Sequence, residues 1–63
     1  MTLEDSACDD LHDAVRLLIR AIAKTTVSEM PQHRRERVVE CVREARTNIE
    51  LARRLIMQGH ADA

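Results

Sequence analysis

The chain has 63 residues, enough for one domain at most, with a formal net charge of −1 and a hydrophobic fraction of 44%. It contains no Phe, Trp or Tyr, which counts against functions that need aromatic stacking on bases or aromatic hot spots. A domain this small rarely builds a sufficient core without a disulfide, a metal or a partner chain. We therefore expect one folded domain over residues 1–63 that relies on more than its own core.

The first ten residues, MTLEDSACDD, are acidic and lack the basic start and apolar core of a secretory signal. No apolar run approaches the ~20 residues that a membrane-spanning helix needs. We expect a cytoplasmic protein that binds no membrane.

A first helix is predicted over residues 3–27. Thr2 and Ser6 each stand three positions before an aspartate, Asp5 and Asp9, which is the spacing of an N-terminal capping box. Mostly apolar residues recur in this segment at intervals of three and four positions, which places them along one face of the helix, here called its seam. These seam positions are Cys8, Leu11, Val15, Leu18, Ile22 and Thr25.

The middle of the chain holds its only proline, Pro31, just after the β-branched run of residues 25–27. Proline is favoured in the first turn of a helix but costs ~3 kcal/mol or more in a helix interior. Ser28 offers a hydroxyl that could cap a second helix. The segment therefore predicts a turn between two helices, and one continuous helix kinked at Pro31 is the competing interpretation.

A second helix is predicted over residues 31–58, followed by Gly59 as its stop signal. Residues 1–2 and 59–63 are expected to fray. The apolar spacing of three and four returns in this segment. Its seam positions are Val38, Val42, Ala45, Ile49, Ala52 and Ile56.

The predicted fold is all-α, an antiparallel hairpin of two helices, because a short connection makes long helices antiparallel neighbours. Several apolar residues fall outside both seams and are expected to stay exposed in a lone hairpin. We therefore expect self-association, most simply a dimeric four-helix bundle, with the parallel and antiparallel arrangements and a tetramer left open. The residues outside the seams are Leu17, Ile19, Val39, Leu51 and Leu55.

Two heptad-patterned segments, DDLHDAVRLLIRAIAKT and ERVVECVREARTNIELARRLIM, flank one tight turn. In size and pattern the chain resembles the small helical-hairpin dimers to which the plasmid repressor-of-primer RNA-binding protein belongs. The aromatic residues on the RNA face of that protein have no counterpart here. The resemblance therefore carries over no functional residue.

The function expected from these features is a small, non-enzymatic regulatory or adaptor role, carried out as a homo-oligomer through helix-face binding to itself and to another protein. A partner helix or groove would meet leftover leucines, and arginines at the turn end would select acidic neighbours. A purely structural oligomer is a third interpretation. The predicted partner-binding residues are Leu17, Leu51, Leu55, Arg34, Arg35 and Arg37.

The alternative function is binding of an RNA or DNA backbone. Arg16, Arg20 and Lys24 are spaced four apart on one helix face and could neutralise phosphates. The chain places no aromatic, Asn or Gln residue along this row to read bases. A solvent-exposed basic face is the plainer interpretation.

The cysteines predict no catalytic, metal or cofactor site. Cys8 and His12 stand one turn apart, but two ligands do not complete a tetrahedral zinc site. In the hairpin, Cys8 and Cys41 are offset by about nine residues, or ~14 Å, beyond the ~7 Å limit on Cα separation for a disulfide. Both are expected to be free thiols.

Overall fold

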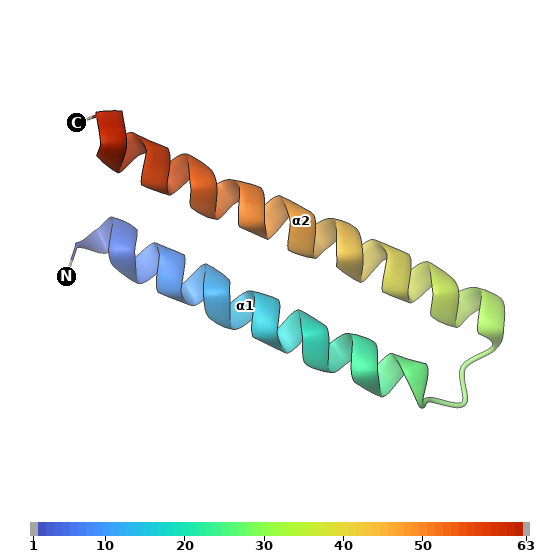
Figure 1. Cartoon of the computed structure of the whole chain (residues 1–63). Helices are drawn as coiled ribbons and strands as arrows, with labels where there is room; N and C mark the ends of the chain where they lie inside the picture. Colours follow the sequence, from blue (N-terminus) through green and yellow to red (C-terminus); the bar gives the residue numbers. More distant parts are fainter. Residues whose placement is uncertain (1, 63) are drawn as a thin grey trace.

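The computed structural model describes residues 2–62, and the side chains of residues 2–58. It consists of helix α1 (Leu3–Thr26) and helix α2 (Gln32–Asp62), which lie side by side and antiparallel (Figure 1). The connection lies at one end and both chain termini lie at the other. The predicted all-α hairpin is confirmed, and the alternative of one continuous kinked helix is wrong.

Helix α1 begins where the sequence predicts. The side-chain oxygen of Thr2 accepts from the Asp5 amide at 3.1 Å, and the Thr2 amide donates to the Asp5 carboxylate at 3.4 Å, forming a capping box. The helix ends at Thr26, one residue before the predicted end. Thr25 and Thr26 each donate a hydroxyl to a carbonyl four residues earlier, at 2.8 Å, a bond that slightly weakens a helix.

The connection differs from the prediction in the role of Ser28. Its hydroxyl donates to the Thr25 carbonyl at 2.7 Å, so Ser28 satisfies the end of α1 and does not cap α2. The Pro31 carbonyl accepts from the Arg35 amide at 2.9 Å, so Pro31 immediately precedes α2. The second helix therefore starts at Gln32, one residue later than predicted.

Helix α2 continues through Gly59 to Asp62, four residues past the predicted end. A glycine ends a helix readily when it adopts the left-handed conformation. Within residues 2–62 no glycine and no other residue has positive φ, so Gly59 does not act as a stop. The fraying expected for residues 1–2 and 59–63 stays a prediction. Met1 and Ala63 lie outside the described residues.

The core is thin. Within residues 2–58, Val15 is the only buried residue, and it is still 7% exposed. The other predicted seam positions of both helices are half-buried, as expected for two helices that cover each other on one side only. Leu17, Ile19, Leu51 and Leu55 are exposed as predicted, whereas Val39 is half-buried and was wrongly expected to be exposed.

The hairpin is also long and open for its size. Its extents are 49 × 18 × 10 Å and its radius of gyration is 14.8 Å, against about 11 Å for a compact domain of this length. Within residues 2–62 neither helix has the length and apolar character required to cross a membrane.

Candidate interaction surfaces

The exposed leucines fall into two separate places. Leu51 and Leu55 are 52% and 59% exposed and stand one turn apart on the same face of α2. Leu55 and Leu3 are equally far along the chain from the middle of the connection, so they lie at the same height along the hairpin axis, near its open end. Leu17, 60% exposed, is at the height of residue 41 and so lies ~15 Å along the hairpin from Leu51.

Leu3 and Met57 are two further exposed apolar residues at the open end, with exposed fractions of 87% and 60%. Neither was predicted as an interaction residue: Leu3 is the first residue of α1, and Met57 lies beside the predicted end of the second helix. Met57 stands two residues from Leu55, about 200° around the helix. It therefore belongs to a different face from Leu51 and Leu55.

The three arginines predicted at the turn end have different surroundings. Arg35 is half-buried, and its Nη2 donates to the carbonyl oxygens of Ser28 at 3.2 Å and Met30 at 2.9 Å. Arg34 and Arg37 are exposed. Arg37 makes a loose pair with Glu40 at 3.7 Å, and such exposed pairs contribute little.

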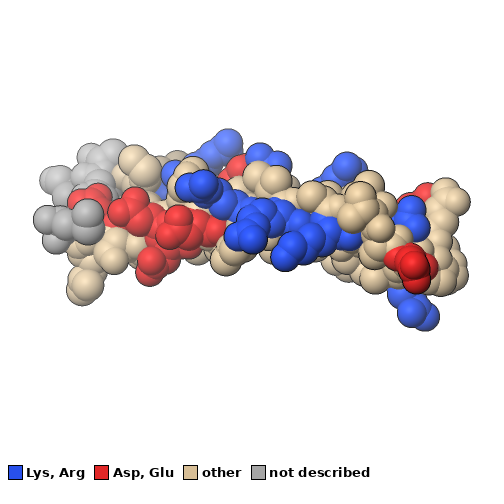
Figure 2. Space-filling view, turned by 90° about the horizontal axis from the view of Figure 1, so that it is seen from below, with Lys and Arg blue, Asp and Glu red and all other residues tan. Residues whose placement is uncertain are grey.

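One face of α1 carries a row of charged side chains, here called the charged stripe, with acids in its N-terminal half and bases in its C-terminal half (Figure 2). With 100° per residue, its members occupy an arc of about 100° on the side of α1 away from the seam. All of them are exposed. They are Asp5, Asp9, Asp13, Arg16, Arg20 and Lys24.

Most of the charged stripe makes no bond within the hairpin. Asp5 belongs to the capping box, but the other five side chains form neither a hydrogen bond nor an ion pair with the side chains that the structure describes, those of residues 2–58. The ion pairs of this part of the chain, Arg37–Glu40 and Arg46–Glu50, both lie within α2. These five side chains of the charged stripe are therefore available to another molecule.

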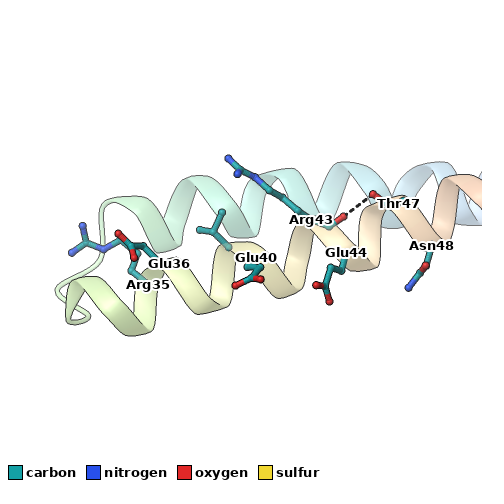
Figure 3. A pocket seen from close by; sticks show the side chains of 8 residues that line it. Arg35, Glu36, Glu40, Arg43, Glu44, Thr47 and Asn48 are labelled. Carbon is teal, nitrogen blue, oxygen red and sulfur yellow. Dashed lines mark hydrogen bonds between the residues drawn. The ribbon is translucent and has the colours of Figure 1, made fainter.

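A shallow hollow on α2 is lined by residues of that helix alone (Figure 3). The Thr47 hydroxyl bonds to the Arg43 carbonyl of the same helix at 3.1 Å, and six of the eight lining residues are exposed. A single helix surface cannot enclose a ligand as a pocket between elements does. The lining residues are Arg35, Glu36, Val39, Glu40, Arg43, Glu44, Thr47 and Asn48.

The two cysteines are unbonded. Cys8 is half-buried on the α1 seam and Cys41 is exposed on α2. In the described part of the chain no three His, Cys, Asp or Glu residues are grouped so that they could hold a metal ion.

The comparisons with known proteins give no relative. No protein-family model, no curated protein and no solved structure matches the chain.

Proposed function

We propose that this hairpin is a non-enzymatic regulatory or adaptor protein that works as a homo-oligomer through its helix faces. The observation that carries the proposal is the thin core, in which Val15 is the only buried residue within residues 2–58. A hairpin covers each helix on one side, and an amphipathic face that stays half-exposed favours further packing.

The exposed surface suggests the size of the first partner. The hairpin exposes 5171 Å², whereas folded monomers of 7.2 kDa expose about 4,100 Å². The excess of about 1,000 Å² is close to the ~800 Å² that each partner contributes to a standard interface. A second copy of the chain would cover this area, and a dimeric four-helix bundle is the simplest assembly that does so.

Leu51 and Leu55 form the apolar part of the proposed interaction surface on α2, and Leu17 forms the part on α1. Arg34 and Arg37 are exposed beside the connection and would select acidic groups on a protein partner. Arg35 is already bonded to the connection. We therefore propose that Arg34 and Arg37, rather than Arg35, contribute to recognition.

The test is the concentration dependence of the molecular mass, measured by sedimentation equilibrium. The wild type is expected to dimerise, and Leu17→Glu is expected to weaken the dimer at least about tenfold, because it buries charge at the interface. Met57→Glu is the matched control, since Met57 is as exposed but lies on another face. A wild type that stays monomeric at every concentration would overturn the proposal.

A second candidate function is binding of a nucleic-acid backbone. The uninterrupted basic half of the charged stripe (Figure 2) favours it, because Arg16, Arg20 and Lys24 are unpaired within the described residues. Labelled RNA and duplex DNA should then bind at low salt and dissociate steeply as salt rises. Absence of binding at low salt would remove this candidate.

A further inference from the structure

The charged stripe of α1 has a self-complementary order. Its acids stand at positions 5, 9 and 13 and its bases at positions 16, 20 and 24, so the midpoint between residues 14 and 15 divides acids from bases. We propose that two copies of the chain join with their α1 helices antiparallel about this midpoint, the acidic half of each stripe on the basic half of the other. This inference rests on the homo-oligomer proposed above and specifies its orientation.

The register follows from the positions. A two-fold axis at the midpoint places two residues, one from each copy, at the same height along the helices when their numbers add up to 29. Asp13 then lies level with Arg16 of the second copy, Asp9 with Arg20, and Asp5 with Lys24, and symmetry repeats each pair. A shift of four residues either way leaves one acid and one base of each stripe without a partner. Parallel α1 helices would place like charges together.

The helix macrodipole does not account for the stripe. Its effect falls off within the first and last turns, which covers Asp5 and Lys24 but not the four inner charges. Those inner charges stand as like-charged neighbours at intervals of four, Asp9 with Asp13 and Arg16 with Arg20, which weakens an isolated helix. A partner of opposite charge order removes that repulsion.

Apolar contact is available close to the proposed axis. Leu17 continues the row of Asp9 and Asp13 by one further turn, and it is 60% exposed. In this register the two copies of Leu17 are separated by five residues in height, or ~8 Å. The charges would then set orientation while the apolar residues provide affinity.

A second copy fits the stripe better than a nucleic acid does. The acidic half lies in line with the basic half on the same face (Figure 2). A polyphosphate that followed the bases along α1 would meet Asp13 and Asp9 next and be repelled. Only a surface that reverses its sign at the same place satisfies both halves, and the chain itself carries that surface.

Two charge-reversed variants test the pairing. Asp9→Lys with Asp13→Lys makes the stripe basic throughout, and Arg16→Glu with Arg20→Glu makes it acidic throughout. Each alone is expected to dimerise at least about tenfold more weakly than the wild type. Their equimolar mixture is expected to form a heterodimer at least as tight as the wild-type dimer. Sedimentation equilibrium gives the affinities, and native mass spectrometry identifies the heterodimer.

The control is Glu36→Lys with Glu40→Lys, which changes the charge by the same amount on α2. It is expected to leave dimerisation within about threefold of the wild type, and circular dichroism checks that every variant is helical. The inference is wrong if the control weakens the dimer as much as the stripe variants do, or if mixing the two stripe variants restores no dimer. In either case α1 does not pair with α1 of the second copy.

Failure of the inference can be told apart from failure of the proposed function. A monomeric wild type overturns both, whereas a wild-type dimer that is indifferent to the stripe variants overturns the orientation alone. If RNA binds the wild type and Arg16→Glu with Arg20→Glu abolishes that binding without changing self-association, the bases serve nucleic acid and the inference is overturned.

Discussion

Arg35 reaches back over the connection, and its Nη2 donates to the carbonyl oxygen of Met30 at 2.9 Å. The same nitrogen donates to the Ser28 carbonyl at 3.2 Å. One side chain in the first turn of α2 therefore supplies a donor to two carbonyl oxygens of the connection, which lie outside both helices. The half-buried guanidinium thereby ties the connection to α2. This contact fixes how α2 leaves the turn.

Replacing Arg35 with Ala is expected to destabilise the fold by about 1–3 kcal/mol, the range for removing hydrogen bonds from a charged donor to part-buried groups. Arg35→Lys should recover only part of the loss, because an ammonium lacks the planar fork. Urea denaturation monitored by circular dichroism measures the difference. Arg34→Ala, at an exposed neighbour, is the control and is expected to stay within about 0.5 kcal/mol of the wild type. Equal losses at the two positions would contradict the structural role of Arg35.

The role of Arg35 was missed by sequence reasoning, which grouped it with Arg34 and Arg37 as a basic cluster. Spacing along a helix shows which residues share a face, but it does not show a side chain that folds back seven residues to Ser28. The one feature of the sequence that could have indicated this role is the position of Arg35 shortly after a turn with a proline, because the backbone carbonyls of a turn need hydrogen-bond donors. The sequence alone does not show which side chain supplies these donors.

The seams were predictable because they depend on periodicity alone. Val15 and its neighbours face α2 at the expected intervals, and the Thr2–Asp5 capping box forms as its spacing indicates. The ends were less predictable, because each depends on a local competition. The Ser28 hydroxyl bonds backward to Thr25 in place of capping α2, and Gly59 keeps negative φ within the helix.

Val15→Ala is expected to cost about 1–3 kcal/mol of unfolding free energy, since it removes two methyl groups from the one site with little solvent contact, where Val15 is 7% exposed. Val27→Ala removes the same atoms at a position that is 83% exposed. The control is therefore expected to change stability by less than about 0.5 kcal/mol. Thermal unfolding at one fixed protein concentration provides the comparison, because dimerisation makes the midpoint concentration-dependent.

The capping box makes a separate contribution at the start of α1. Thr2→Ala removes the side-chain acceptor of the Asp5 amide and is expected to cost about 0.5–2 kcal/mol. Thr2→Ser retains the oxygen and should remain close to the wild type. Thr47→Ala is the control, because its hydroxyl bonds only to an exposed carbonyl within α2 at 3.1 Å. A loss at Thr47 as large as that at Thr2 would mean that capping contributes nothing specific.

The two cysteines report the orientation of the proposed dimer. About the proposed axis, the two copies of Cys8 are thirteen residues apart in height, ~20 Å, which is too far for a disulfide. A Cys41→Ser variant, which retains Cys8 alone, is therefore expected to stay uncrosslinked under mild oxidation on a non-reducing gel. In a parallel dimer the two Cys8 residues would be level and could bond.

The positive control places a cysteine beside the axis. Asp13→Cys in a chain with Cys8→Ser and Cys41→Ser puts two thiols on the paired stripes about three residues apart in height, ~4.5 Å, so an antiparallel dimer should crosslink through them. Dilution to concentrations at which the wild type is monomeric should remove the crosslink, which separates dimer contact from random collision. Rapid Cys8 crosslinking together with inert cysteines at position 13 would show that the hairpins run parallel.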